Sequence, residues 1–224
     1  MELNVKQSGI VDRLVFSTNF KIKNRCLRRT VERYLREDLS CGLHSCETCA
    51  SLGLNNLGRN TNEGKNTVVF GNHAIIVDAE VCLRFMDVFD SSLFTNIIIT
   101  QNVWEYVKQK SITTYKKLNK FVYEDKDPRF AIFMSEFHHK TFVRQEIELS
   151  DSLRREKVLY VCANFLKDHW SKYNIVPVVL CAEDDILSRL KSNYELTFTI
   201  KQYIAGEILV SSSLCSEISN SIQL

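Results

Sequence analysis

Three cysteines lie within nine residues of one another in the segment "LSCGLHSCETC" and have the spacing of metal ligands. Cys41, Cys46 and Cys49 form a C-x4-C-x2-C pattern. Thiolates at such short spacings are typical ligands of Zn²⁺, which takes four ligands in a tetrahedral arrangement at structural sites. The triplet is therefore one ligand short of a complete site, and His44 is the nearest candidate for the fourth ligand.

The other cysteines have the pattern of buried, reduced thiols. The sequence contains eight cysteines. Four of them lie inside apolar segments, where a reduced cysteine behaves as a small hydrophobic residue: Cys26, Cys82, Cys162 and Cys181. Because disulfides persist mainly in oxidising compartments, this pattern indicates a reducing one.

Acidic residues follow two strongly apolar segments and suggest a second kind of chemistry. "HAIIVDAE" reaches its first acid at Asp78, and "VPVVLCAEDD" ends in Glu183, Asp184 and Asp185. Carboxylates gathered at the ends of parallel strands can bind Mg²⁺ or Mn²⁺, and such ions activate water for phosphodiester hydrolysis. An acid in this position is also a common helix N-cap, so the pattern leaves both a nuclease site and a structural role open.

A basic segment, Lys21–Arg36, precedes the cysteines. We predict a strand-like entry that runs into an amphipathic basic helix, because charged and apolar residues recur at helical spacing. Its cations could contact RNA phosphates or an acidic partner, or could form a solvated surface over a buried stripe. These cations are Lys21, Lys23, Arg25, Arg28, Arg29, Arg33 and Arg36.

The remaining elements alternate between apolar strands and amphipathic helices. Continuous aliphatic strands separated by helices indicate an α/β fold with a parallel sheet. Strands are predicted at "VVF", "HAIIVDAE", "NIIIT", "RFAIF" and "VPVVLC". Helices are predicted over Val81–Phe89, Gln101–Lys110, Thr113–Tyr123, Arg154–Trp170 and Ile186–Lys191.

Length and composition predict one main domain with an extension. The chain has 224 residues and a formal net charge of +2, so net charge gives no argument for general nucleic-acid affinity. It lacks any run of eighteen apolar residues and begins with polar residues, which argues against secretion and membrane insertion. The Gly- and Asn-rich stretch Gly53–Asn66 predicts a boundary near Lys65. We expect an extension over 1–65, a domain over 66–206 and a Ser-rich tail or linker over 207–224.

Five segments together resemble a known family. They are "TVERYLREDLSCGLHSCETC", "HAIIVDAEV", "NVWEYVKQKSITTYKKL", "FAIFMSEFHHKTFV" and "PVVLCAEDDI". In order and spacing they are similar to the N-terminal PIN region of the catalytic ribonuclease of the RNA exosome, over about Leu14–Gly206. The resemblance implies a three-layer PIN fold with a central, mainly parallel sheet, preceded by a zinc-stapled extension. It also implies that His169, in "FLKDHW", is the fourth ligand of a structural Zn²⁺.

The same resemblance implies a degenerate nuclease site. Active family members carry four acids, of which Asp78 and Asp184 match the first and fourth. The third position falls on Glu156, and the second falls on Tyr106, with Glu105 one residue earlier and so rotated about 100° around a helix. We therefore expect Zn²⁺ as the cofactor, with little or no cleavage that depends on Mg²⁺ or Mn²⁺. This pattern resembles the cytoplasmic Dis3-like branch, which implies a cytoplasmic location, with the nucleus as the alternative.

Three functions follow from these residues. The first is a docking module on the exosome core, with Lys21–Arg36 as the docking surface and any 3′–5′ exonuclease in a further C-terminal portion. The second is a Mn²⁺-dependent endoribonuclease for single-stranded RNA, using Asp78, Glu156 and Asp184 with Glu105 in place of the missing acid. The third is passive binding of RNA through the basic segment.

Overall fold

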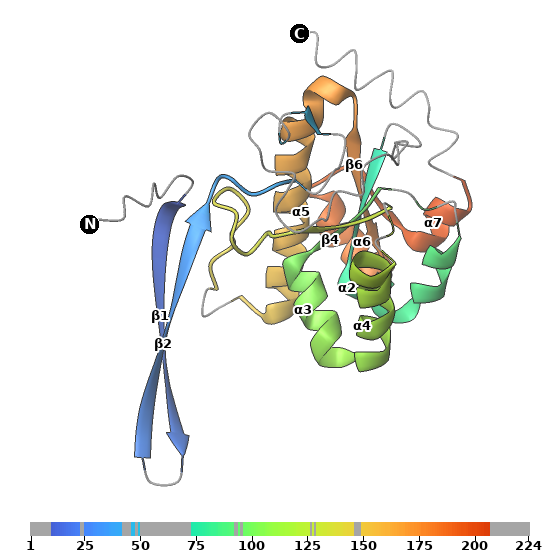
Figure 1. The fold of residues 1–224 in the computed structure, drawn as a ribbon. Helices are drawn as coiled ribbons and strands as arrows, with labels where there is room; N and C mark the ends of the chain where they lie inside the picture. The colour runs from blue at the N-terminus through green and yellow to red at the C-terminus, as the bar shows by residue number, and fades with distance from the viewer. Residues whose placement is uncertain are drawn as a thin grey trace.

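The computed structural model describes residues 10–22, 25–41, 46–47, 49, 73–91, 94, 96–125, 127, 129–145 and 149–206 (Figure 1). Several sequence predictions lie outside these residues. They are the linker Gly53–Asn66, the strand at "VVF" and the Ser-rich tail after residue 206. The domain limits 1–65, 66–206 and 207–224 therefore stay predictions.

A five-stranded, all-parallel sheet forms the centre of the domain (Figure 1). In spatial order its strands are β5 (Phe130–Phe133), β4 (Ile97–Thr100), β3 (His73–Val77), β6 (Val176–Cys181) and β7 (Thr197–Thr199). Four of the strands lie where the aliphatic runs predicted them. The short strand β7 was not predicted, because three residues carry too little pattern.

The central strand β3 explains why the sheet is covered on both faces. Its residues Ala74, Ile75, Ile76 and Val77 are fully buried, although successive side chains of a strand point to opposite faces. Ile76 pairs with Ile98 of β4 on one side and with Val179 of β6 on the other. The sheet therefore lies between two layers of other structure, as the predicted three-layer α/β fold requires.

Helices lie between the parallel strands in the chain, and the last helix follows β7. They are α2 (Ala79–Arg84), α3 (Gln101–Lys110), α4 (Ile112–Asn119), α5 (Asp151–Trp170), α6 (Asp184–Lys191) and α7 (Ile200–Ile204). Short turns of other helix types are η2 (Met86–Asp90), η3 (Lys120–Glu124) and η4 (Ser171–Tyr173). The helix predicted over Val81–Phe89 is divided at Phe85 into α2 and η2. Within the described residues, no helix has the length and apolar character to cross a membrane.

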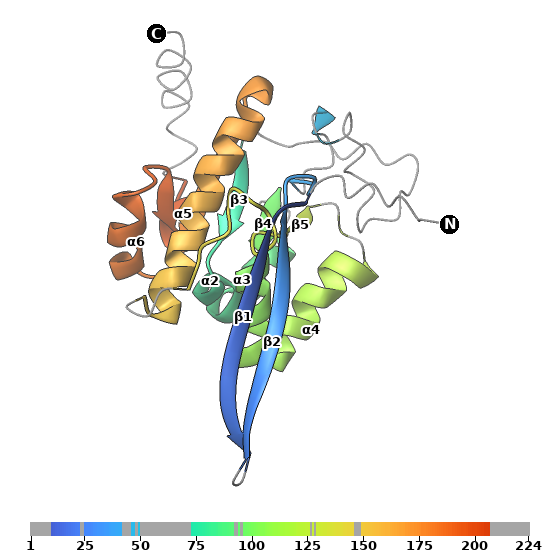
Figure 2. The same cartoon turned by 90° about the vertical axis from the view of Figure 1, so that its left-hand side faces the viewer.

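Helix α5 is the long element that links the two predicted sites (Figure 2). It begins at Ser150, whose hydroxyl accepts a hydrogen bond from the backbone N–H of Leu153 at 3.3 Å. Such an N-cap satisfies one of the free donors at a helix start. The helix carries Glu156 near its beginning and His169 in its last turn.

The basic segment is a β-hairpin, so the predicted helix within Lys21–Arg36 is wrong. Strand β1 (Ile10–Ile22) pairs with β2 (Arg25–Arg36) in an antiparallel ladder. A helix in this segment would need a core on which to bury its apolar stripe, but Val31 and Tyr34 are exposed. Pairing with β1 instead satisfies the backbone hydrogen bonds, and helical spacing within one segment could not reveal that long-range partner.

The hairpin projects from the body of the domain and is fixed to it at the end of β2 (Figure 1). The backbone N–H of Arg36 donates to the carbonyl of Phe137 at 2.8 Å, and the N–H of His139 donates to the carbonyl of Arg36 at 2.7 Å. Nearby, Arg33 forms an ion pair with the buried Glu136 at 2.7 Å. These contacts hold β2 next to the segment that follows β5.

Candidate functional site

The four predicted zinc ligands come together. Cys41, Cys46 and Cys49 are buried, and His169 reaches them from the end of α5. Their four ligand atoms all lie within 4.8 Å of one another. His169 Nε2 is 3.3 Å from Cys46 Sγ and 3.4 Å from Cys49 Sγ. Adjacent ligands of a tetrahedral zinc site are separated by about 3.5–3.8 Å, given bond lengths of about 2.0–2.3 Å. This cluster could therefore hold a metal ion.

Contacts within the cluster shift the pKa values of Cys46 and His169. The thiols of Cys41 and Cys49 donate toward Cys46 and lower its pKa, and contacts with Cys46 and Cys49 raise the pKa of His169 to about 9. The indole N–H of Trp170 lies 3.3 Å from Cys41 Sγ. A metal ion binding here would displace protons from thiol and imidazole, so its affinity depends on pH. His44 lies outside the described residues.

The first predicted carboxylate, Asp78, is buried at the end of β3. Only 4% of its surface is exposed, and its side chain accepts a hydrogen bond from the backbone N–H of Glu80 at 3.3 Å. It is thus the N-cap of α2, which was one of the two roles left open by the sequence. Burial raises the pKa of Asp78 to about 6.

The third carboxylate, Glu156, is occupied by a cation from the chain itself. Arg189 of α6 donates from Nε and from an Nη to the two carboxylate oxygens of Glu156, at 2.8 and 2.9 Å. The Glu156 side chain is 7% exposed. Both of its oxygens therefore already have a guanidinium partner.

A second arginine packs against Tyr106, the residue at the position of the missing acid. The guanidinium carbon of Arg155 lies 3.7 Å from the ring centroid of Tyr106, within the range of a cation–π contact. The charge of Arg155 also acts on Asp78, where it opposes the effect of burial on the pKa of that carboxyl. An arginine thus faces both Tyr106 and the first acid.

The two remaining carboxylates do not complete a ligand set. Glu105 is exposed and accepts a hydrogen bond from Gln101 Nε2 at 2.8 Å. Asp184 is exposed in the first turn of α6, and its neighbour Glu183 forms an ion pair with Arg84. Among the residues that the structure describes, no three of Asp78, Glu105, Glu156 and Asp184 gather as a possible metal-binding group.

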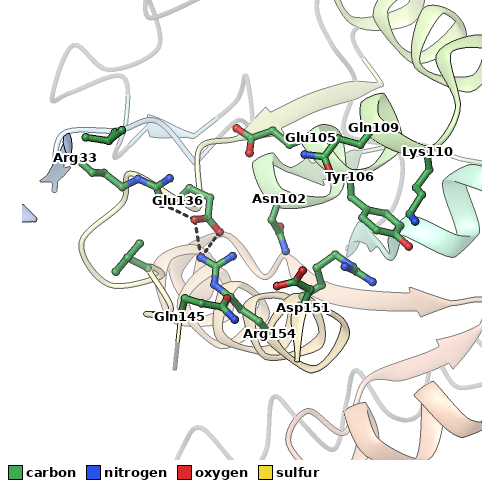
Figure 3. Close-up of a pocket in the computed structure, with 13 residues that line it drawn as sticks. Arg33, Asn102, Glu105, Tyr106, Gln109, Lys110, Glu136, Gln145, Asp151 and Arg154 are labelled. Carbon is green, nitrogen blue, oxygen red and sulfur yellow. Dashed lines mark hydrogen bonds and ion pairs between the residues drawn. The ribbon is translucent and has the colours of Figure 1, made fainter. Parts of the chain in front are cut away.

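A pocket of about 550 Å³ is lined by Glu105, one of the four candidate carboxylates, and by Tyr106 (Figure 3). The hairpin contributes Arg33 to its wall, and α3 and α5 contribute Tyr106 and Arg154. Glu136 accepts hydrogen bonds from both Arg33 and Arg154 across the pocket, and these bonds are the dashed lines of Figure 3. The pocket therefore joins the hairpin to the domain.

Four important residues were not singled out from the sequence: Asn102, Glu136, Arg155 and Arg189. Each lies in an ordinary helical or loop pattern. Glu136, Arg155 and Arg189 contact partners distant in the sequence, and Asn102 is notable only for its burial in the wall of the pocket. Only Arg155 carried a local signal, because it precedes Glu156 directly. Of the seven predicted docking cations, Arg33 pairs with Glu136 and Arg36 pairs with Asp38. Lys23 lies outside the described residues, and only the backbone is described for Lys21, Arg25, Arg28 and Arg29.

Comparison with known proteins relates this architecture to one family. No protein-family model matches the chain. A probable exosome complex exonuclease RRP44 from Caenorhabditis elegans is 45% identical over 91% of the chain. The chain belongs to the Rrp44/Dis3 family, as an N-terminal PIN region. The human exosome complex exonuclease RRP44 is 28% identical over 63% of the chain, and dis3 of Schizosaccharomyces pombe is 28% identical over 77%.

A solved structure confirms the PIN fold. The PIN domain of T. brucei RRP44 matches 82% of this chain and 99% of its own length, with a TM-score of 0.63 at 20% sequence identity. The chain spans only 15–21% of the length of the three Rrp44/Dis3 relatives named above. The names of these relatives do not test the predicted Dis3-like branch, which stays a prediction.

Proposed function

We propose that this PIN region docks an exosome-associated ribonuclease onto the exosome core and does not itself cleave RNA. The proposal that the region does not cleave RNA is supported by two arginines in the carboxylate site. Arg189 holds both oxygens of Glu156, and Arg155 lies against Tyr106 and near Asp78. A divalent ion would have to displace one guanidinium and bind next to another.

The energetics favour the built-in cations. Mg²⁺ binds at about 2.0–2.1 Å to oxygen ligands in near-octahedral geometry, so it tolerates few losses from its ligand set. Tyr106 offers a neutral ring where the family has an acid, and Arg155 adds a positive charge. An intramolecular Arg189–Glu156 pair also needs no metal from solution, because its partners are already held by α5 and α6.

The metal of the cysteine cluster is proposed to be Zn²⁺ with a structural role. Three thiolates and one imidazole form a closed tetrahedral set with no open position for a substrate, as at structural zinc sites. Such an ion would tie the segment after the hairpin to the end of α5. It would therefore fix the extension on the PIN core.

The hairpin is the proposed docking surface. Apolar side chains on it are exposed rather than packed: Ile10, Val11, Val15, Val31 and Tyr34 have between 37% and 56% of their surface accessible. Exposed apolar residues gathered on one projecting element are typical of an interaction site. The names of the relatives, exosome complex exonucleases, support the exosome as the proposed partner. Because the described cysteines include six free thiols, we infer a reducing compartment, the cytoplasm or the nucleus.

One observation favours a second candidate, a Mn²⁺-dependent endoribonuclease. Glu105 and Asp151 both line the pocket beside Tyr106, so carboxylates remain available there. This candidate requires that a metal ion bind at Asp78 in spite of Arg155. Cleavage of RNA that depends on Asp78 would support it.

Docking can be tested by the binding of the full chain to a reconstituted exosome core ring, measured by biolayer interferometry. The double variant Val11→Ser and Val15→Ser changes exposed residues of β1 and should weaken binding about ten-fold or more, because apolar anchors dominate interface energies. Ile112→Ser is the matched control, since Ile112 is 60% exposed on α4. Failure of the wild-type chain to bind, or equal binding by both variants, would contradict the docking proposal.

A further inference from the structure

The pocket lined by Glu105 and Tyr106 contains a buried donor without a partner among the described residues. Asn102 is 6% exposed, and its Oδ1 accepts a hydrogen bond from the Thr100 hydroxyl at 2.6 Å. That bond fixes the orientation of the amide, and Asn102 Nδ2 has no hydrogen-bond partner among the described residues. Figure 3 shows the Asn102 side chain directed into the pocket, toward Asp151. An unsatisfied buried donor is unfavourable, so an acceptor from a ligand would stabilise it.

Two cations gather on the same side of the pocket. The guanidinium carbon of Arg155 lies 3.7 Å, and Nζ of Lys110 lies 5.4 Å, from the ring centroid of Tyr106. Among the described residues no ion pair is formed by either cation, whereas Arg154 is held by Glu136. Two positive charges at one ring repel each other, and an anion near both would relieve that repulsion.

The remaining charges of the pocket are nearly balanced and leave room for one added anion. Four cations and three carboxylates line it, and Glu136 is shared between Arg33 and Arg154. Glu105 is hydrogen bonded to Gln101. Asp151 is the third carboxylate, so the lining keeps one net positive charge. Arg155 and Lys110 are its cations without an ion pair among the described residues, whereas Arg33 and Arg154 are both paired with Glu136.

We propose that this pocket binds the phosphate group of a nucleotide without a divalent metal ion. Asn102 Nδ2 and the Arg155 guanidinium donate hydrogen bonds to phosphate oxygens, and Lys110 adds a positive charge. A guanidinium matches the geometry of phosphate oxygens and keeps its charge at all accessible pH values. The volume of about 550 Å³ exceeds what a phosphate ion alone fills and has the size of a small-molecule site, which leaves space for a sugar and a base.

This inference rests on the proposed function, in which arginines take the place of the metal ions. It deepens that function, because a site that no longer cleaves would then still hold a nucleotide. The ligand chemistry has two sources, a free nucleoside monophosphate and the backbone of single-stranded RNA. Both supply the same phosphate oxygens.

The test is isothermal titration calorimetry of the full, zinc-loaded chain in buffer free of Mg²⁺ and Mn²⁺. The probes are uridine 5′-monophosphate, a short single-stranded oligouridylate and uridine, which lacks the phosphate. We expect binding of at least one phosphate-bearing probe and none of uridine. Binding by the oligouridylate alone would identify RNA as the source, and binding by the monophosphate would identify the free nucleotide.

Variants distinguish binding in the pocket from nonspecific attraction of the probes to surface cations. Asn102→Leu removes the donor at nearly constant shape, and Arg155→Met removes the guanidinium. Each should weaken binding about ten-fold or more, the scale of a charge-assisted hydrogen bond. Asn102→Leu also removes the acceptor of the buried Thr100 hydroxyl, so urea unfolding must first show that the variant is folded at the temperature of the titration. Lys172→Met is the matched control, since Lys172 is exposed at η4, outside the pocket.

Two results would overturn the inference: no phosphate-bearing probe binds without divalent metal, or neither pocket variant weakens the binding. A requirement for Mn²⁺ would point instead to a retained metal site and would count against the proposed function as well. Binding to the exosome core is measured on variants of β1 that do not line this pocket. The docking proposal is therefore tested independently of the phosphate-binding inference.

Discussion

The cysteine–histidine cluster and the carboxylate site share one helix but surround their candidate ligands differently. Helix α5 contributes to both, with His169 in its last turn and Glu156 near its start. In the cluster, four ligand atoms converge within 4.8 Å. In the carboxylate site, Arg189 and Arg155 lie where a metal ion would need free oxygens. The comparison teaches that side-chain cations next to candidate ligands decide, as much as the ligands themselves, whether a metal ion can bind.

The two sites also differ in how their ligands are charged. Buried thiols next to an imidazole gain from exchanging protons for a dipositive ion, since each thiolate is a strong ligand of zinc. Buried carboxylates next to arginines already have their countercharge, and an added cation is repelled. We therefore expect the same helix to carry one site that favours a metal ion and one that disfavours it.

The largest expected effect is on the cluster. His169→Ala or Cys46→Ser should abolish stoichiometric zinc and strongly destabilise the fold, since structural zinc contributes about 10 kcal/mol or more in small sites. Inductively coupled plasma mass spectrometry measures the zinc content, and thermal unfolding measures the loss of stability. Cys181→Ser is the control, because Cys181 is buried on β6 but is not a ligand. Full zinc content in His169→Ala would remove His169 from the ligand set.

The second-largest expected effect is the dependence of the free energy of unfolding on pH, which the buried Asp78 causes. Its folded-state pKa of about 6 exceeds its ordinary value of 3.8, so the folded state binds this proton more tightly. The resulting stabilisation is complete below about pH 3.8 and is lost as the pH rises through about 6. At 1.36 kcal/mol per pKa unit, the charged form costs about 3 kcal/mol near neutral pH.

Asp78→Asn should therefore stabilise the protein by up to about 3 kcal/mol at pH 7–8 and flatten the pH profile between pH 4 and 6. Asparagine also remains a good N-cap for α2, so the helix start is kept. Urea unfolding at several pH values, with and without Mn²⁺, measures both effects. If the pH profile of Asp78→Asn matched that of the wild type, burial of the Asp78 carboxylate would not cause the pH dependence. If Mn²⁺ shifted the wild-type profile, a metal ion would bind at the carboxylate site, and our account of that site would be wrong.

The smallest expected effect tests whether a change at the start of α5 alters zinc binding at the other end of the helix. Ser150→Ala removes the N-cap hydroxyl of α5 and should cost about 1 kcal/mol. Zinc content should stay at the wild-type level, because His169 lies at the other end of the helix. Ser152→Ala, at an exposed position in the first turn of α5, is the matched control for unfolding in urea. Loss of zinc in Ser150→Ala would mean that the start of α5 positions the cluster.

Sequence patterns predicted the sheet because its strands are continuous aliphatic runs. They predicted the cluster because thiol ligands are rare and closely spaced, while the fourth ligand, His169, came from the family resemblance. The basic hairpin was taken for a helix, since its partner strand β1 is a contact outside the segment itself. Arg155 and Arg189 were overlooked for a similar reason: an arginine on a helix looks solvated until its partners, Tyr106 and Glu156, are placed beside it.

The central claim, that arginines have replaced the metal ions of the carboxylate site, is tested most directly with circular single-stranded RNA. The wild-type chain, shown to be folded and zinc-loaded, is incubated with the circle and Mn²⁺ beside Asp78→Asn. A circle has no ends, so contaminating exonucleases cannot degrade it. We predict that the circle stays intact with both proteins. Cleavage by the wild type that disappears in Asp78→Asn would contradict the claim and establish a working metal site.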